Sequence, residues 1–351
     1  MVLGDVMKRF LLLSLMLFFL TSCKKDDKIV RQMEINFDND YYQVATPYKS
    51  SVGNNYVVNN VLNNYNINDI EEVFTMISSN YFKPSNSLYQ TGQYLDQKEL
   101  KELLSTENLN KAETLSIDDI SINPVYLSSI YEQNYLTNNG DLKGITIGLI
   151  FNPYQAYKNE FGSYNYKTIE LDVLEPIIIS KANEIVKYLR DKSELNKIKL
   201  VIGVYLQNKP NAILPGSIKY IGVTEKKNIE LTKINYEYQY LNSKYALEYD
   251  FNTYNAFLNL EKQLKKFKDI ISISGKGLYY DDVIQNIEMT VYSGVFNKGE
   301  LLYLCEMISK EMINFDNHLN IKVYVKSNDT KVAFIKKESH SLKSNINILD
   351  G

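Results

Sequence analysis

The chain has 351 residues, of which 44% are hydrophobic and 23% charged, as is typical of a folded globular protein. Its 39 basic and 42 acidic side chains give a net charge of −3, so the charge balance gives no reason to expect a nucleic-acid partner. With two histidines and two cysteines, a catalytic triad, a cysteine–histidine pair or a histidine metal site has almost nothing to be built from, and we expect no metal and no cofactor.

The N-terminus has the pattern of a bacterial lipoprotein signal. The basic pair Lys8-Arg9 precedes an apolar run over residues 10–20, which fits the roughly 7–15 residues of a signal core but not the about 20 of a spanning helix. The following Leu20-Thr21-Ser22-Cys23 resembles the lipobox, which implies lipid transfer to the Cys23 thiol and cleavage between Ser22 and Cys23. We therefore predict a signal peptide at 1–22 and a lipid anchor on the extracytoplasmic face of the cell membrane.

The alternatives for this segment are an ordinary signal peptide with a chance cysteine, or a buried cysteine in a core helix. Residues 23–40 are polar and charged without any period, so we predict a flexible tether there. Ordered structure is expected to begin near Tyr41-Tyr42-Gln43-Val44.

Residues 41–141 are predicted to be mainly helical. Apolar residues at helical spacing indicate a helix over 68–82, and Asp96 can cap a second helix over 96–104. Pro124 fits the first turn of a third helix that runs to about Tyr135. The intervening 106–120 is predicted to be a loop.

Two β-α-β-β units are predicted to follow this helical region. The first, 142–227, has strands at 144–151, 197–206 and 217–224 and a helix at about 172–191. The second unit, 284–338, has strands at 287–295, 319–326 and 331–336 and a helix at 298–314. Each unit would place its crossover helix on one face of a mixed sheet.

A helical insert at 228–283 would separate the two units, and a tail would occupy 339–351. The best helix of the insert is 250–268, and 270–274 could add a strand. The fold class is therefore α+β: a helical N-terminal region, followed by two β-α-β-β units that form mixed sheet or sheets.

Few side chains outside the leader suggest chemistry. Cys305 lies on an apolar helical face and is expected to be a buried structural thiol. The adjacent acids Asp281-Asp282 and Glu71-Glu72 should diverge and be solvated surface charges, and Ser274-Gly275-Lys276-Gly277 is interpreted as a turn and not a phosphate loop.

Several segments in the same order resemble the CamS family of sex-pheromone lipoproteins from low-GC Gram-positive bacteria. The resemblance covers most of the chain after the leader. The segments that carry it are Tyr41-Tyr42 through Pro47-Tyr48-Lys49, Leu62-Asn63-Asn64-Tyr65, Tyr81-Phe82-Lys83-Pro84, Gln90-Thr91-Gly92-Gln93-Tyr94-Leu95, Asn123-Pro124-Val125-Tyr126-Leu127, Leu214-Pro215-Gly216 and Gly275-Lys276-Gly277-Leu278-Tyr279-Tyr280. The chain departs from the family pattern at Gln43 and Asn54, where the family carries arginines, so an anion contact is not carried over to these positions.

The resemblance implies that the cleaved leader is trimmed to a short hydrophobic pheromone. By position this peptide would consist of Met16, Leu17, Phe18, Phe19, Leu20, Thr21 and Ser22. Two functions are open to the folded domain: a non-enzymatic lipoprotein that binds an envelope protein, a peptide or a glycan, or a cell-wall-acting enzyme that uses carboxylates or tyrosines. The lack of histidines favours the first, so we expect no enzyme.

We predict that culture medium contains the leader fragment 16–22, with or without Leu15, because signal cleavage before Cys23 leaves this apolar end free for trimming. Mass spectrometry of the medium would detect it. The absence of every such fragment from medium of cells that make the protein would contradict the pheromone hypothesis.

Overall fold

The structure is a computed structural model, and it describes residues 42–53, 56, 67–117, 120–294 and 297–349. All the described elements belong to one compact unit, Phe37–Gly351. The predicted leader and its pheromone segment, Cys23 and the tether at 23–40 lie outside the described residues, so the statements about them stay predictions.

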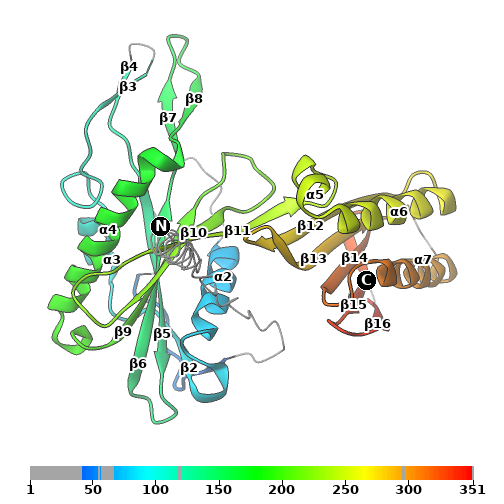
Figure 1. Ribbon diagram of the computed structural model, residues 1–351, viewed down its shortest axis with the longest axis horizontal. Helices are drawn as coiled ribbons and strands as arrows, with labels where there is room; N and C mark the ends of the chain where they lie inside the picture. The colour runs from blue at the N-terminus through cyan, green and yellow to red at the C-terminus, as the bar shows by residue number, and fades with distance from the viewer. Residues whose placement is uncertain (1–41, 54–55, 57–66, 118–119, 295–296, 350–351) are drawn as a thin grey trace, which may run out of the picture. The chain divides into compact units, whose positions relative to one another are not determined.

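A sheet of twelve strands forms the frame of the described chain (Figure 1). Three neighbouring pairs, β1–β2, β6–β9 and β13–β14, are parallel, and the other pairs are antiparallel. In spatial order the strands are β1 (Gln43–Val44), β2 (Leu88–Thr91), β5 (Leu127–Leu136), β6 (Leu142–Phe151), β9 (Lys199–Leu206), β10 (Ser217–Thr224), β11 (Thr232–Tyr240), β12 (Ser272–Tyr280), β13 (Val283–Tyr292), β14 (Asn320–Ser327), β15 (Thr330–Lys337) and β16 (Ser344–Ile348).

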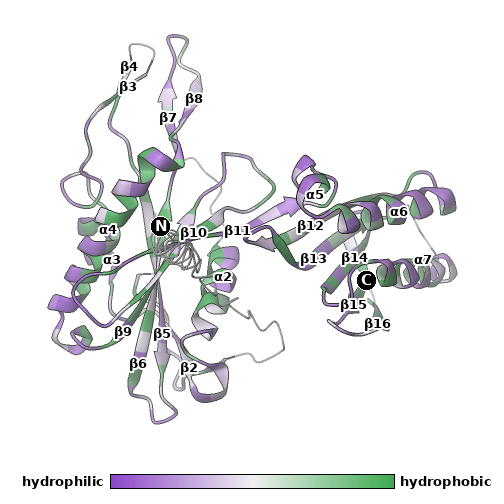
Figure 2. Ribbon diagram, viewed as in Figure 1, coloured by the Kyte–Doolittle hydropathy of each residue, from purple (hydrophilic) through white to green (hydrophobic). Residues whose placement is uncertain are grey.

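Helices pack on this sheet in two groups, each with its own hydrophobic core. Helices α3 (Gln97–Leu103) and α4 (Leu171–Asp191) cover one face of β5, β6 and β9, and α2 (Ile67–Ser79) packs on β6 and β9 from the other face. Further along the sheet, α6 (Phe251–Phe267) and α7 (Lys298–Glu311) cover β12–β15, with α5 (Lys244–Tyr249) beside α6. Each long helix turns its hydrophilic side away from the sheet (Figure 2).

Local sequence signals explain where several helices begin. The Asp96 side chain accepts from the Glu99 N–H at 2.8 Å and the Glu99 carboxylate accepts from the Asp96 N–H, which makes a capping box for α3. Asp250 caps α6 and Asn297 caps α7 in the same way, each by accepting from a backbone N–H three residues ahead.

Helix α2 approaches the sheet where two strands lack side chains. Gly148 of β6 and Gly203 of β9 are neighbours in the parallel pair, and the Phe74 ring of α2 lies over both. A Cβ at either glycine would come within 2.4 Å of that ring. The close approach of Phe74 therefore requires glycine at both positions, and it leaves the ring fully buried.

The six predicted strands of the two units are confirmed as β6, β9, β10, β13, β14 and β15, although β13 begins and ends a few residues earlier than predicted. The predicted helices near 68–82, 96–104, 172–191, 250–268 and 298–314 are confirmed as α2, α3, α4, α6 and α7. The mixed α/β class is also confirmed. All the long strands share one sheet, because β11 and β12 connect β10 with β13.

The mainly helical interpretation of 41–141 is wrong for the described residues. The predicted helix from Pro124 to Tyr135 is instead strand β5, and every one of its residues is buried. In the sequence its polar side chains resemble the solvent-exposed face of a helix. In the structure they are buried and hydrogen-bonded: Ser128 donates to the Ile150 carbonyl at 2.9 Å, and Gln133 donates to Thr75 at 2.9 Å. Pairing with β2 and β6 on either side overrides the local pattern.

Four further segments differ from prediction. The expected loop 106–120 contributes β3 (Leu115–Ile117), which pairs with β4 (Ile120–Ile122), and a second small hairpin, β7 (Tyr154–Lys158) with β8 (Tyr164–Thr168), precedes α4. The insert 228–283 holds strands β11 and β12 besides its helices, and the tail 339–351 adds β16 to the sheet. Several of these strands are short and rich in polar residues, as β3, β4 and β16 show, so their sequences resemble loops.

We predict that Phe74→Ala lowers the free energy of unfolding by about 3–5 kcal/mol, because it leaves a cavity over two strands whose glycines cannot fill it. Phe161→Ala is the matched control, since that ring is 88% exposed and its loss should change stability by less than about 0.5 kcal/mol. Urea unfolding of both variants measures the difference. If the Phe74→Ala and Phe161→Ala proteins had equal free energies of unfolding, the packing of Phe74 on the two glycines would contribute little to stability.

Candidate functional site

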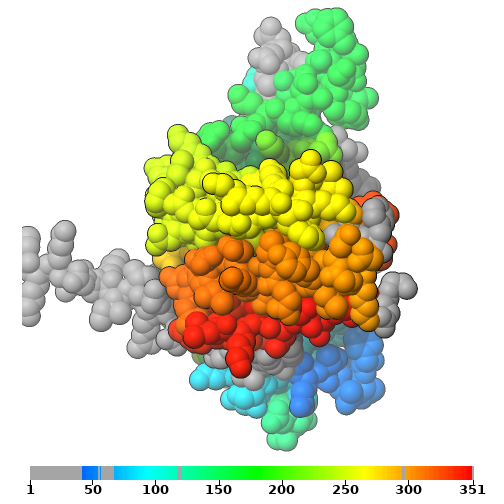
Figure 3. All heavy atoms as spheres, turned by 90° about the vertical axis from the view of Figure 1, so that its right-hand side faces the viewer, coloured from blue at the N-terminus to red at the C-terminus, as the bar shows by residue number. Residues whose placement is uncertain are grey.

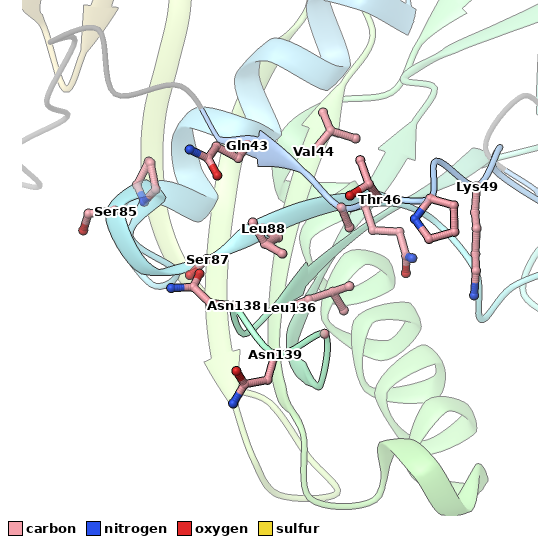
Figure 4. A pocket seen from close by; sticks show the side chains of 15 residues that line it. Gln43, Val44, Thr46, Lys49, Ser85, Ser87, Leu88, Leu136, Asn138 and Asn139 are labelled. Carbon is pink, nitrogen blue, oxygen red and sulfur yellow. The ribbon is translucent and has the colours of Figure 1, made fainter.

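A large cavity among the described residues lies at the end of the sheet where β1 and β2 pair. It holds about 780 Å³, and we name it the edge pocket (Figure 4). Its walls come from β1 and the following segment, from the turn before β2, and from the turn that follows β5. The residues that line it are Gln43, Val44, Ala45, Thr46, Pro47, Lys49, Pro84, Ser85, Ser87, Leu88, Gln90, Leu136, Asn138, Asn139 and Gly140.

The lining of the edge pocket is polar but nearly uncharged. Side-chain amides of Gln43, Gln90, Asn138 and Asn139 alternate with hydroxyls, and Lys49 is the one charged residue among those that line it. Ser87 and Asn138 both line the pocket, although they come from different segments (Figure 4). Amides and hydroxyls both donate and accept, so the pocket suits a ligand that is rich in neutral hydrogen-bonding groups.

Hydrogen bonds from the end of β2 hold the outer wall of the pocket. The Ala45 N–H donates to the Tyr89 carbonyl at 2.8 Å, which continues the parallel pairing of β1. The Thr91 hydroxyl donates to the Lys49 carbonyl, and the Gln93 amide donates to the Ser50 carbonyl, both at 2.9 Å. The wall from 45 to 50 therefore depends on the position of residues 89–93.

The buried carboxylate of Glu132, on the neighbouring strand β5, fixes the position of the segment that follows β2. Glu132 of β5 is 1% exposed, and its two oxygens accept from the backbone N–H groups of Gln93, Tyr94 and Leu95 at 2.8–3.2 Å. Burial raises the pKa of the Glu132 carboxyl, although the three N–H donors favour its charged form. Because the strand β5 is rigid, Glu132 ties the segment after β2 to the core and so positions the wall of the edge pocket.

A second cavity of about 370 Å³, the inner pocket, lies beyond the carboxyl ends of the parallel strands β6 and β9. Lys219 and Glu237 form an ion pair of 2.6 Å on its wall. Burial opposes ionisation of Glu237, but the Lys219 ammonium outweighs burial and lowers the pKa. The Gln207 amide also lines the pocket: its oxygen accepts from Ser128 at 2.8 Å, whereas its buried nitrogen has no hydrogen-bond partner among the residues that the structure describes.

The structure separates the side chains that the sequence singled out. Cys305 is fully buried in the core under α7, and burial raises the pKa of its thiol to about 11, so it is not a nucleophile at neutral pH. Asp281 accepts from the Asn235 N–H while Asp282 accepts from the Tyr245 hydroxyl, so these adjacent acids serve different contacts. His318 pairs with Asp316 at 2.8 Å in an exposed turn.

The residues of the edge pocket were missed from the sequence. The turn at 138–141 was predicted, and it carries two amides of the lining, but no pattern indicated that Gln43 and Gln90 would lie across from it. Glu132 fell in a segment predicted to be helical, where a charged residue is assigned to the surface.

None of the helices in the described ranges has the length and apolar character that crossing a membrane requires.

We predict that Glu132→Gln lowers the free energy of unfolding by at least about 2 kcal/mol, because an amide cannot accept from three N–H groups as a carboxylate does. Amide hydrogen exchange should quicken at 93–95, and Glu107→Gln, an exposed acid, is the control. If the two variants were equally stable and exchanged alike, Glu132 would not position the pocket wall.

Known proteins resemble this chain in sequence and in structure. The family model "CamS sex pheromone cAM373 precursor" matches residues 48–343. A crystal structure of a sex pheromone precursor from Lactobacillus salivarius subsp. salivarius has a TM-score of 0.74 and 21% identity, covering 82% of this chain and 88% of that one. The C-terminal domain of the sex pheromone staph-cAM373 precursor from Staphylococcus aureus has a TM-score of 0.70 and 22% identity, covering 82% and 97%.

At such identities the two structures establish a shared fold and nothing further. No curated protein matches the sequence. The family model, by contrast, matches most of the chain, and it confirms the resemblance seen in the sequence. The chain therefore belongs to the CamS family of sex pheromone precursors.

Proposed function

We propose that this chain is a lipid-anchored envelope lipoprotein with two products: a short hydrophobic peptide from its leader, and a folded domain that binds an extended, uncharged peptide segment of an envelope partner in the edge pocket. The first half rests on the leader pattern and on the family. The second half rests on one observation, the neutral polar lining of the edge pocket beside an edge strand.

The anchor and the peptide depend on the same residue. Cleavage before Cys23 frees the segment 16–22, and lipid on Cys23 keeps the rest of the chain at the membrane. Diacylglycerol and a further acyl chain give stable anchoring, because each buried methylene contributes about 0.8 kcal/mol. The membership in a family of sex pheromone precursors supports the release of a peptide.

The edge pocket offers what an extended peptide needs. Strand β1 ends the sheet, and in the described residues no strand pairs with its outer side. Gln43 and Val44 are both exposed, so a peptide could add to β1 by backbone hydrogen bonds while amides and hydroxyls of the pocket bind its remaining polar groups. The neutral Gln43, which stands where the family carries an arginine, suits an uncharged segment.

The small number of carboxylates that line the two pockets favours binding over catalysis. Among the residues that line the edge pocket none is a carboxylate, and the inner pocket has Glu237 alone, paired with Lys219. A glycosidase mechanism would need two carboxyl groups about 5–9 Å apart across the scissile bond. The cell-wall-acting enzyme therefore remains the second choice, without an observation that favours it.

We predict that Cys23→Ala moves the protein from the membrane fraction of cells to the medium or leaves it unprocessed, because the lipid-accepting thiol is lost. Metabolic labelling with a fatty acid followed by cell fractionation measures both effects. Cys305→Ala is the control, and it should keep the label. A Cys23→Ala protein that is labelled and fractionates like the wild type would contradict the anchor.

We further predict that a photo-crosslinking amino acid at Asn139, in the intact chain on living cells, captures a partner, whereas the same group at Asn259 on the exposed side of α6 does not. Gln90→Ala and Asn138→Ala should each weaken the capture by about 2- to 12-fold, the loss of one neutral hydrogen bond. Capture that is equal at both positions, or unchanged in the variants, would contradict binding in the edge pocket.

A further inference from the structure

Strands β12–β16 bury only one of their two faces. Alternate apolar residues, such as Met289 of β13 and Val323 of β14, pack beneath α6 and α7, which lie side by side across that face (Figure 3). Since successive side chains of a strand point to opposite faces, the residues between them lie on the other side of the sheet. We name this side of β12–β16 the open sheet face.

The open sheet face is strongly basic in a chain whose net charge is negative. It carries five lysines, Lys276, Lys322, Lys326, Lys331 and Lys336, and among its own strand residues one acid, Glu288. Glu288 pairs with Lys276 at 3.4 Å, and Glu338 pairs with Lys336. Burial raises the pKa of Tyr324, and the negative charges of Glu288 and of Glu72 on α2 raise it further. Glu72 is therefore a second acid near this face.

Two lysine pairs lie directly opposite one another on neighbouring strands. Lys322 of β14 faces Lys336 of β15, and Lys326 faces Lys331. Like charges at facing positions of a sheet destabilise it. Acids offset part of the repulsion in the first pair, because Lys336 pairs with Glu338 and Glu288 stands beside Lys322 on the neighbouring strand β13. Within the described residues neither Lys326 nor Lys331 forms an ion pair, so the repulsion between these two is not compensated by a neighbouring acid.

Aromatic rings fix where the ammonium groups lie. The Lys331 ammonium lies 4.1 Å from the centre of the Tyr324 ring, which packs in turn on Phe334 with ring centres 5.1 Å apart. The Lys326 ammonium lies 5.7 Å from the centre of the Tyr292 ring. Such contacts hold the charges in place while leaving their donors open to a ligand.

The spacing of these charges selects a ligand with repeated anionic groups. Lys322 and Lys326 are four residues apart on β14, which corresponds to roughly 13 Å, so a single phosphate cannot reach both. A chain of phosphates can place one group at each lysine pair, and lysine is a common point-charge partner of phosphate. A membrane surface fits this face less well, because binding to a membrane surface uses exposed apolar and aromatic side chains. Among the described large aromatic residues of this face, Tyr292 alone is more than a third exposed.

We propose that the open sheet face binds a linear phosphate polyanion, which lies across β14 and β15 and neutralises the two facing lysine pairs. The site is separate from the edge pocket, and it takes the opposite class of ligand. Its binding would compensate the repulsion that the fold retains there.

The test uses the full chain purified in detergent, with inorganic polyphosphate of defined length as the probe and orthophosphate for comparison. We expect polyphosphate to bind with a log–log salt slope of about −3, from roughly four neutralised phosphates, and orthophosphate not to bind measurably. The triple variant Lys322→Gln, Lys326→Gln, Lys331→Gln should weaken binding by about tenfold or more and reduce the slope to about −1.

The matched control removes the same charge from the helical side, as Lys262→Gln, Lys266→Gln, Lys310→Gln, all exposed on α6 and α7. It should bind within about twofold of the wild type. The unfolding midpoint of the open-face variant should stay equal or rise, since two repulsive pairs are removed. Absence of polyphosphate binding, equal losses in both triple variants, or binding only to phosphatidylglycerol vesicles would overturn the proposal.

Discussion

Strands β6 and β9 lie in parallel near the middle of one half of the sheet, and both are buried on both faces. Helix α4 packs on one side and α2 on the other, so nearly every side chain of these strands contributes to a core, at roughly 1.5–3 kcal/mol for each large aliphatic group that is fully buried. This double coverage orders the neighbouring strand β5, and through β5 it orders the edge pocket.

The connection from the core to the edge pocket runs through polar groups. Strand β5 carries several buried polar residues, and each finds a partner in a different neighbour: Gln133 in α2, Ser128 in β6, and Glu132 in the segment after β2. Hydrogen bonds of this kind contribute little net energy but fix geometry, because a buried donor or acceptor without a partner is costly. The wall of the edge pocket derives its position from them.

Much of the fold could be predicted from the sequence where a single local rule decides. The runs at 144–151 and 197–206 are continuously apolar, as strands buried on both faces must be, and capping residues mark the start of α3 and α6. β5 could not be predicted in this way. Its polar residues are satisfied by segments that lie 22–79 positions away in the chain, and no local pattern contains that information.

The candidate site was less predictable than the fold, because pocket residues come together only when β1 pairs with β2. Gln43 and Gln90 are ordinary polar residues until that pairing brings them to one cavity with the turn at 138–140. Segments that carry the resemblance to the CamS family, at 42–49, 81–84 and 90–95, border or support this pocket, but the resemblance by itself did not indicate that they form a site.

The two halves of the sheet differ in what they leave exposed, and this difference separates their roles. Where α2 and α4 enclose the strands, both faces of the sheet are covered, and ligands can approach at the strand ends or at the edge, where the lining of the edge pocket is nearly uncharged. Where α6 and α7 cover one face alone, the opposite face of β12–β16 stays open and carries most of its charge as lysine. A site that binds by hydrogen bonds needs donors and acceptors in fixed positions, and in the edge pocket the buried Glu132 fixes the wall that carries them. A site for a polyanion needs only charges at suitable intervals, which a regular strand provides by itself. One continuous sheet therefore carries both proposed sites, and each lies where the packing of the helices leaves the sheet accessible.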